Sequence, residues 1–252
     1  MHKRKSVFIT GATSGVGYAL TKKLLADQDH YHVIGTGRAP DAIWTLQNEG
    51  AHMVRADLSR PEEVDFLLTQ VGTPDIVVFS AGVGRFATAH ETSDEAMHDM
   101  MNMNAILPMQ LTKRLLPDMI QRGSGHLIYI GSQAGKVATP KAAVYAASKH
   151  AIIGFTDALR MEVAPFGIHV TAIHPGPIDT PFLDVADDTG HYRKALGNHL
   201  LSVDAVCDAV IKTIEQPVRE VNLPGYMGVT SKLHAIAPGL VERIGRKFFT
   251  KK

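Results

Sequence analysis

The chain has 252 residues, of which 45% are hydrophobic, so it can bury a sizeable core as one large α/β domain or as two small ones. Its net charge of +1 gives no general attraction to nucleic acid or acidic partners, and its single cysteine, Cys207, excludes an internal disulfide and favours a cytoplasmic location. The apolar runs are too short for a signal peptide or a membrane span, and the 13 histidines are scattered, so we expect neither a membrane-spanning helix nor a metal site.

The first predicted elements are a strand, a glycine-rich turn and a helix. Residues 6–10 are apolar and β-branched, which predicts a buried strand, and leucines recur at helical spacing after Gly17. Gly11 would permit a tight turn, Gly15 would let backbone approach a pyrophosphate, and Gly17 would let the helix pack on the strand. The free N–H groups of the helix would face the phosphates. We expect the turn to bind a dinucleotide through Gly11, Thr13, Ser14, Gly15, Val16 and Gly17; a glycine-rich turn without a ligand is the alternative.

The end of the second predicted strand, residues 31–36, bears on the choice of dinucleotide. In dinucleotide folds this position carries an acidic residue for the ribose 2′-hydroxyl or a basic one for a 2′-phosphate. Gly37 places no carboxylate there, and the guanidinium of Arg38 can bind a phosphate through two hydrogen bonds. Asp41 is the one feature that argues against this. We expect NADP(H), with NAD(H) as the alternative; Arg38 taken alone also fits an ordinary solvated charge.

Further strands, each nearly continuous in apolar residues, predict a parallel sheet with helices on both faces. They are expected at residues 51–55, 75–79, 125–130, 167–173 and 219–223. Residues 93–122 are predicted to be helical, with Pro108 and Pro117 marking kinks or joints, and Ser59 and Ser202 are expected to cap the helices that follow them. Without internal repeats or linkers, we expect a single doubly wound Rossmann domain over 1–252 with about seven parallel strands.

Tyr145-Ala146-Ala147-Ser148-Lys149 opens a predicted long, largely buried helix. Because Tyr145 and Lys149 are four residues apart, a helix places both on one face. A free phenol titrates near pH ~10, and a neighbouring cation would lower its pKa toward the range of efficient acid–base catalysis. Alone, such a pair is more often a helix-surface pair without chemistry. His174, at the end of the strand 167–173, is expected to be a hydrogen-bonded structural histidine rather than a base.

The last part of the chain carries no readable catalytic motif. Residues 181–200 have weak periodicity and no strong element, which is typical of a lid at the mouth of a site. From Ser231 onward, apolar residues recur at helical spacing with lysines and arginines between them, which predicts an amphipathic helical extension over 225–252. We expect this helix to pack on its own domain or on a partner subunit, with a membrane surface as the alternative. Residues 83–90, 181–200 and the tail are expected to shape a substrate pocket.

Taken together, these motifs make the chain resemble the short-chain dehydrogenase/reductase family from about residue 5 to 225. The glycine turn resembles the family's cofactor turn, and the serine of Ser80-Ala81-Gly82 stands where the family has asparagine in Asn-Ala-Gly. That asparagine is thought to brace the central strand, and a serine has a single donor and a shorter reach, which leaves the bracing open. The resemblance implies cofactor contacts at Asp57, Leu58, Ser80, Ala81, Gly82, Tyr145, Lys149, Pro175, Gly176, Ile178 and Thr180.

The resemblance also implies the reaction and the residues that carry it. The expected enzyme transfers hydride between a nicotinamide and a small carbonyl or secondary alcohol substrate. Tyr145 would be the general acid or base, Lys149 would stabilise its phenolate and bind the nicotinamide ribose, Ser132 would orient the carbonyl, and Asn104 would hold a water that links Lys149 to solvent. A homodimer or homotetramer is expected. The alternatives are a dinucleotide-sensing regulator without turnover and a membrane-associated lipid or steroid-type reductase.

Overall fold

The computed structural model describes residues 4–249, apart from the side chains at 198 and 246–249. Within this part of the chain, seven strands form one sheet in the order β3-β2-β1-β4-β5-β6-β7, and each neighbouring pair is parallel. This confirms the predicted doubly wound sheet. The strands are β1 (Lys5–Thr10), β2 (Tyr31–Gly37), β3 (His52–Arg55), β4 (Ile76–Phe79), β5 (Gly125–Ile130), β6 (Ile168–Pro175) and β7 (Glu220–Leu223).

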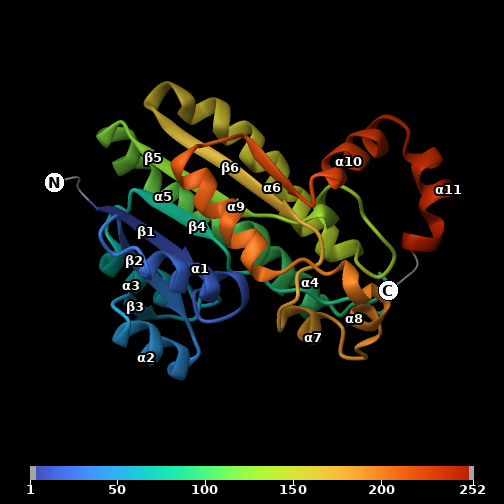
Figure 1. Cartoon of the computed structure of the whole chain (residues 1–252), viewed down its shortest axis with the longest axis horizontal. Helices are drawn as coiled ribbons and strands as arrows, with labels where there is room; N and C mark the ends of the chain where they lie inside the picture. Colours follow the sequence, from blue (N-terminus) through green and yellow to red (C-terminus); the bar gives the residue numbers. More distant parts are fainter. Residues whose placement is uncertain (1–3, 250–252) are drawn as a thin grey trace.

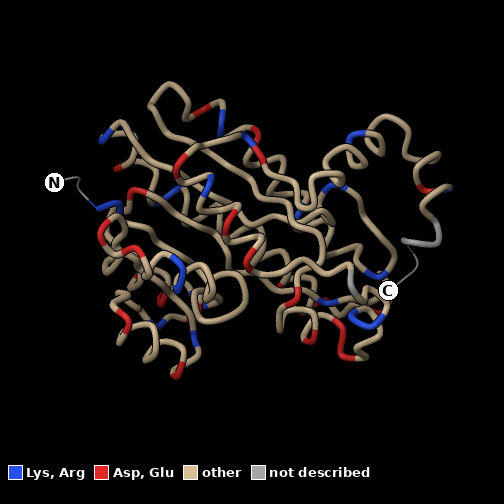
Figure 2. Tube along the Cα trace, in the orientation of Figure 1, with Lys and Arg blue, Asp and Glu red and all other residues tan. Residues whose placement is uncertain are grey.

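Helices cover both faces of the sheet (Figure 1). Successive strand residues point to opposite faces, so Val7 and Ile9 belong to one core cluster and Phe8 to the other. The first cluster includes residues of α1 (Gly15–Leu25), α2 (Pro40–Asn48) and α9 (Val203–Glu215). The second includes residues of α3 (Pro61–Val71), α5 (Leu107–Arg122) and α6 (Ala143–Val163). Figure 2 shows Lys and Arg interspersed with Asp and Glu along these outer elements.

The predicted helical stretch 93–122 is helical throughout but changes its pitch in the middle. Helix α4 (Asp94–Met101) passes through a π-helix (Asn102–Ile106) into α5. Pro108 has no N–H, so it cannot donate the α-helical hydrogen bond to the carbonyl of Asn104 four residues earlier. The wider turn therefore lies directly before this proline, as expected for a joint, whereas Pro117 lies inside α5.

One of the two predicted helix caps is wrong. Ser202 accepts a hydrogen bond from the N–H of Ala205 over 3.2 Å and caps α9 as expected. Ser59 instead donates its hydroxyl proton to Asp57 Oδ1 over 2.8 Å, and Arg60 occupies the cap position of α3. Helix α3 begins at Pro61, so its cap position falls on Arg60, one residue after Ser59.

Two predictions about the end of the chain need correction. Residues 181–200 contain α7 (Phe182–Ala186) and α8 (His191–Leu196), although we expected no strong element there. The tail forms two helices, α10 (Tyr226–Ile236) and α11 (Pro238–Phe249), instead of one. Ala237 leaves helical geometry because the residue before a proline is disfavoured in it. All four helices lie beyond the carboxyl ends of the strands (Figure 1); residues 250–252 of the predicted extension lie outside the described part.

Candidate active site

A cleft of about 980 Å³ lies at the carboxyl ends of the strands. Its volume is near the upper end of the range of roughly 300–1,000 Å³ for small-molecule sites. Gly17 and Asn104 lie outside its lining, behind the residues that form it. The predicted site residues that do line it are Gly11, Thr13, Ser14, Gly15, Val16, Arg38, Asp57, Leu58, Ser80, Ala81, Gly82, Ser132, Tyr145, Lys149, Pro175, Gly176, Ile178 and Thr180.

The glycine turn needs its glycines for two separate reasons. Gly11 has a φ of +70°, and a Cβ there would lie 2.9 Å from the Cα of Ala81. A Cβ at Gly17 would overlap the carbonyl oxygen of Gly11, so α1 can start close to the turn only with glycine at this position. The N–H groups of the first turn of α1 have no partner within the helix and carry its positive end. This end of the cleft therefore suits an anion such as a pyrophosphate.

Thr10 braces the ends of β1 and β4, a role that the sequence did not reveal. The N–H groups of Ser80 and Ala81 both donate to Thr10 Oγ1 over 3.1 Å. The loop after β4 is thus tied to the neighbouring strand by a side chain of β1. Bracing of this strand end does not depend on an asparagine at position 80.

Arg38 lies at the outer end of the cleft, with 72% of its side chain exposed. Its Nη1 is 3.6 Å from Asp57 Oδ2, and hydrogen bonds from Ser59 hold the pKa of Asp57 below its usual value. A Cβ at Gly37 would overlap the side chain of Thr13, so an acidic residue there would have to displace it. The chain therefore presents the exposed guanidinium of Arg38 directly after β2, and it leaves no room for a carboxylate side chain at residue 37.

Tyr145 and Lys149 are both buried on the first turns of α6, with exposed fractions of 8% and 7%. Lys149 Nζ is 5.9 Å from the centroid of the Tyr145 ring and donates to the carbonyl of Ile130 over 3.0 Å. Burial raises the pKa of Tyr145 to about 12, against an opposing effect of the Ser132 hydroxyl, and burial lowers the pKa of Lys149 to about 8. The predicted lowering of the phenol pKa is therefore wrong for this structure, because desolvation disfavours both charged forms.

Ser132 follows β5 and caps a short 3-10 helix, Gln133–Gly135, by accepting from the N–H of Ala134 over 3.1 Å. A Cβ at Gly135 would lie 2.8 Å from the backbone of Lys149, so the short helix packs directly on α6. Gln133 donates to the carbonyl of His174 over 2.8 Å and to Asn222 Oδ1 over 2.9 Å. The segment that carries Ser132 is therefore held between α6 and the strands β6 and β7.

Asn104 lies in the π-helix and is 2% exposed. Its Oδ1 accepts from the N–H of Val83 over 2.9 Å, and its Nδ2 donates to the carbonyl of Val83 over 2.8 Å and to Ser148 Oγ over 2.9 Å. Ser148 in turn donates to the carbonyl of Tyr145 over 2.8 Å. Asn104 thus joins the loop after β4 to the helix of Tyr145. Ser148 was missed from the sequence, although its place between Tyr145 and Lys149 was a signal.

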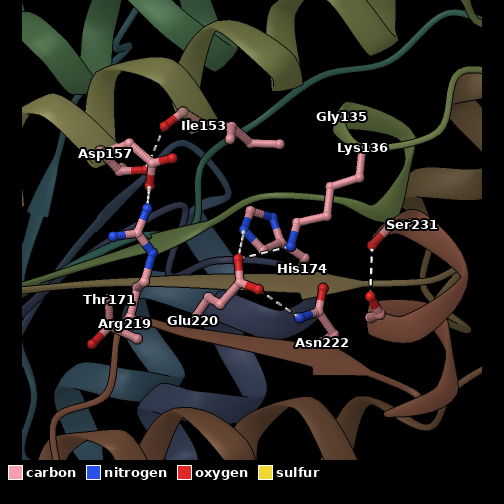
Figure 3. A network of polar contacts seen from close by, with 12 residues as sticks. Gly135, Lys136, Ile153, Asp157, Thr171, His174, Arg219, Glu220, Asn222 and Ser231 are labelled. Atoms are coloured by element: carbon pink, nitrogen blue, oxygen red, sulfur yellow. Dashed lines mark hydrogen bonds and ion pairs between the residues drawn. The ribbon is translucent and has the colours of Figure 1, made fainter. Parts of the chain in front are cut away.

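His174 is 1% exposed and lies outside the lining of the cleft. Its Nδ1 has no hydrogen-bond partner, and its Nε2 is 3.8 Å from Glu220 Oε2, which is too long for a hydrogen bond. The expected structural histidine is therefore buried at the strand end, where its backbone carbonyl accepts from Gln133 but its ring makes no hydrogen bond to Glu220. Burial lowers its pKa to about 4. Figure 3 shows Glu220 in contact with His174, Lys136 and Asn222. Glu220 accepts from Lys136 over 2.7 Å and from Asn222 over 3.1 Å.

Aromatic side chains surround Tyr145 on the side of the cleft away from the glycine turn. The ring centroids of Phe86 and Phe182 are 5.9 Å and 5.8 Å from that of Tyr145, and Tyr192 packs on Phe86 at 5.1 Å. No motif identified these residues, although the segments 83–90 and 181–200 were expected to shape a pocket. The C-terminal helices also contribute to the lining, through Tyr226, Met227, Thr230, Leu233, Val241, Ile244 and Gly245.

Among the described residues, no group of three or more His, Cys, Asp or Glu side chains is placed to hold a metal ion. In the same part of the chain, no helix combines the length and the apolar character needed to cross a membrane.

Comparison with known proteins identifies similar chains. The family model described as short chain dehydrogenase matches residues 5–190. The uncharacterized oxidoreductase YbbO of Escherichia coli (strain K12) is 37% identical over 191 residues, which are 74% of this chain and 70% of YbbO. The closed form of serine dehydrogenase complexed with NADP+ has a TM-score of 0.79 and 28% identity, covering 86% of this chain and 93% of that one. A 4-hydroxyisoleucine dehydrogenase mutant complexed with NADH and succinate has a TM-score of 0.76 and 25% identity, covering 86% and 96%.

Proposed function

Because the chain belongs to the short-chain dehydrogenase/reductase family, we propose that it is an NADP(H)-dependent enzyme that interconverts a carbonyl compound and an alcohol. The observation that carries the proposal is the burial of Tyr145 beside Lys149 in a cleft that continues to the glycine turn. The proposal treats 1–252 as one Rossmann domain with 225–252 as a helical extension, in a cytoplasmic protein. The single cysteine, which is fully buried, supports a reducing compartment.

The cleft fits a nicotinamide dinucleotide at both of its ends. The backbone around Gly11 and Gly15 and the N-terminus of α1 would hold the pyrophosphate. Thr180 lies next to this turn, because a Cβ at Gly15 would be 3.6 Å from the methyl group of Thr180. Near the catalytic centre, a Cβ at Gly82 would lie 3.6 Å from Lys149 Nζ, so the bare backbone keeps space open beside the ammonium. When bound, the nicotinamide supplies or accepts the hydride.

NADP(H) is the cofactor that we propose, with NAD(H) as the alternative. The exposed guanidinium of Arg38 and the absence of a side chain at Gly37 support a 2′-phosphate at this end of the cleft. The negative charge of Asp57 opposes the binding of a 2′-phosphate only in part, because its carboxylate already accepts two hydrogen bonds from Ser59. The two solved structures named above contain NADP+ and NADH respectively, so the choice rests on these residues of the chain itself.

In the proposed reduction, Tyr145 donates its phenolic proton to the carbonyl oxygen. Its raised pKa keeps the phenol protonated at neutral pH, so it is ready to act as the acid. Lys149, with a pKa of about 8, is mostly charged at pH 7 and stabilises the phenolate as it forms. Ser132 orients the carbonyl by donating to its oxygen, and loss of one such donor typically costs ~2.7–4 kcal/mol of transition-state stabilisation. Asn104 holds the water through which Lys149 exchanges a proton with solvent.

A screen of NADPH oxidation over aldehydes, ketones and diketones tests the proposal. We expect turnover of at least one class in the wild-type protein and its loss in the Tyr145→Phe variant. The same assay separates the dinucleotide-sensing alternative, because a sensor would bind NADPH without consuming it. The set of Ser132, Tyr145, Lys149 and Asn104, of which the last three are buried, argues for turnover, since binding alone needs no proton donor.

The proposal includes a homodimer or homotetramer that uses α4, α5 and α6. Exposed apolar side chains on this face support it: Ile106 in the π-helix is 41% exposed and Met161 on α6 is 72% exposed. Light scattering on the purified protein measures the mass directly, and a monomer at micromolar concentration would contradict this part. Co-sedimentation with liposomes would detect the alternative, in which α11 binds a membrane surface.

A further inference from the structure

The charged side chains of the cleft are confined to the part assigned to the cofactor and the proton transfer. Among the described lining residues, the charged ones are Arg38 and Asp57 at the outer end and Lys149 at the catalytic centre. The lining that remains around and beyond Tyr145 contains no further Lys, Arg, Asp or Glu among the described residues. It consists mainly of aliphatic and aromatic residues, and its polar side chains are those of Gln133, Thr139, His199 and Thr230 and the hydroxyls of Tyr192 and Tyr226.

Two groups of charged residues next to lining residues in the sequence are paired among themselves. Arg85 binds Asp188 over 2.8 Å, and Arg193 binds Asp184 over 2.9 Å and also Asp179. None of these side chains belongs to the lining. A substrate carboxylate or ammonium placed among the apolar residues would therefore lose its water without gaining a partner of opposite charge, which is costly.

The helices α10 and α11 extend this apolar lining outward. Leu233 and Ile244 line the cleft, yet they are 53% and 75% exposed, so their apolar surface faces open space. Apolar surface of this kind is stabilised when a ligand covers it. It lies in the same continuous cleft as Tyr145 and the rings of Phe86 and Phe182.

We propose that the substrate is an uncharged aldehyde or ketone with a long apolar group, which extends from Tyr145 past the aromatic rings to the inner faces of α10 and α11. This inference rests on the proposed function, because it assumes that Tyr145 protonates the carbonyl oxygen. It assigns Leu233 and Ile244 as residues that determine specificity. The reaction itself is unchanged: hydride adds to the carbonyl carbon, the Tyr145 proton adds to its oxygen, and NADPH is oxidised.

A chain-length series tests the substrate class. With the full chain and saturating NADPH, straight-chain aldehydes from propanal to decanal should show kcat/KM rising roughly threefold to fourfold for each added methylene, until the apolar surface is covered. Two kinds of charged compound serve as comparisons. One is the ω-oxo carboxylate of the same length as each long aldehyde, and the other is a hydroxy amino acid such as serine, tested in the direction of oxidation. Each long ω-oxo carboxylate should fall about tenfold or more below its neutral counterpart. A flat series, or equal turnover of the charged compounds, would overturn the inference.

Matched variants test the role of the C-terminal helices. Leu233→Lys and Ile244→Lys place a charge on the cleft side, whereas Ile236→Lys and Leu240→Lys place the same charge on exposed residues of the same helices outside the lining; Ile236 is 82% and Leu240 is 60% exposed. All four sites are exposed, so the fold should tolerate the lysine. We expect the first pair to lose the length dependence, and the second pair, which lies outside the lining, to behave as wild type. Equal effects of both pairs would contradict the assignment.

A binding measurement separates this inference from the proposed function. Linear alkyl amides carry a carbonyl that the enzyme does not reduce, so their binding, measured calorimetrically, is independent of turnover. Affinity should increase with alkyl length in the wild type and stop increasing in Leu233→Lys. If no carbonyl compound is turned over but the amides show this dependence, the proposed reaction fails and the apolar site stands. Affinity that does not change with alkyl length would reject the apolar site whatever the activity.

Discussion

Asn104 Nδ2 and Ser148 Oγ lie 2.9 Å apart, and this hydrogen bond joins the π-helix to the helix that carries Tyr145 and Lys149. The same amide holds both backbone groups of Val83 in the loop after β4. One buried side chain therefore links the helix of Tyr145 and Lys149 to the loop after β4. The relationship makes Asn104 a structural hub as well as the proposed holder of a water.

Replacing Asn104 with alanine should destabilise the protein and lower its activity. The substitution removes the partner of both the N–H and the carbonyl of Val83, whereas Ser148 keeps its hydrogen bond to the carbonyl of Tyr145. Each buried group left unsatisfied costs about 1–3 kcal/mol. Urea unfolding measures the loss in the free energy of unfolding. Asn102→Ala, in the same π-helix but exposed, is the control and should change stability by less than about 0.5 kcal/mol. Equal stability of the two variants would show that the Asn104 hydrogen bonds contribute nothing net.

Tyr145→Phe removes the proposed proton donor and keeps the ring. Reduction of a substrate found in the NADPH screen should fall by roughly two to four orders of magnitude, the usual contribution of a general acid. The circular dichroism spectrum and NADPH binding, followed by fluorescence, should stay unchanged. Tyr31→Phe, another buried tyrosine outside the cleft, controls for loss of a hydroxyl. Near wild-type turnover of Tyr145→Phe would refute the assignment of the acid.

Lys149→Met should abolish activity and, at pH 7, raise the melting temperature. Burial lowers the pKa of Lys149 to about 8 from the ordinary 10.5, so the charged lysine destabilises the folded state by as much as about 3 kcal/mol. Between about pH 8 and 10.5, the unfolded chain binds more protons at this residue than the folded chain. The stability of the wild type therefore rises with pH in this window relative to the variant. Melting curves from pH 7 to 10.5 should show the difference shrinking; a constant difference would contradict the lowered pKa.

Arg38→Asp should shift cofactor preference from NADPH toward NADH. The variant replaces a cation that can bind a 2′-phosphate with a carboxylate that repels it and can accept from a 2′-hydroxyl. The ratio of kcat/KM for NADPH and NADH should fall by at least about tenfold, since a hydrogen bond to a charged group contributes ~1.5–3 kcal/mol. Arg60→Asp, which makes the same change of charge outside the cleft, should leave the ratio unaltered. An unchanged ratio in Arg38→Asp would argue against NADP(H).

Local patterns in the sequence were sufficient to predict the parallel sheet, the glycine turn and the pair Tyr145 and Lys149, whereas the roles of Ser132 and Asn104 came from the resemblance to a known family. Each strand is a short apolar run whose pattern does not depend on distant residues, but the order of the strands was decided by the tertiary structure. The glycine turn and the pair Tyr145 and Lys149 are also local, because their geometry depends on spacing within one turn or one helix. Ser59 shows the limit of this reasoning, since its hydroxyl donates to the carboxylate of Asp57 and does not cap the helix that follows.

Only the tertiary structure decided the features that depend on burial and on contacts between distant segments. The direction of the Tyr145 pKa shift follows from desolvation by the whole fold, which outweighs the opposing hydrogen bond with Ser132. The bond between Asn104 and Ser148 spans 44 residues, and Gln133 reaches Asn222 across 89. The placement of Leu233 and Ile244 in the same cleft as Gly11 brings together the two ends of the chain. Such contacts arise from the packing of distant segments, and the periodicity of the sequence does not show how deeply each polar side chain is buried.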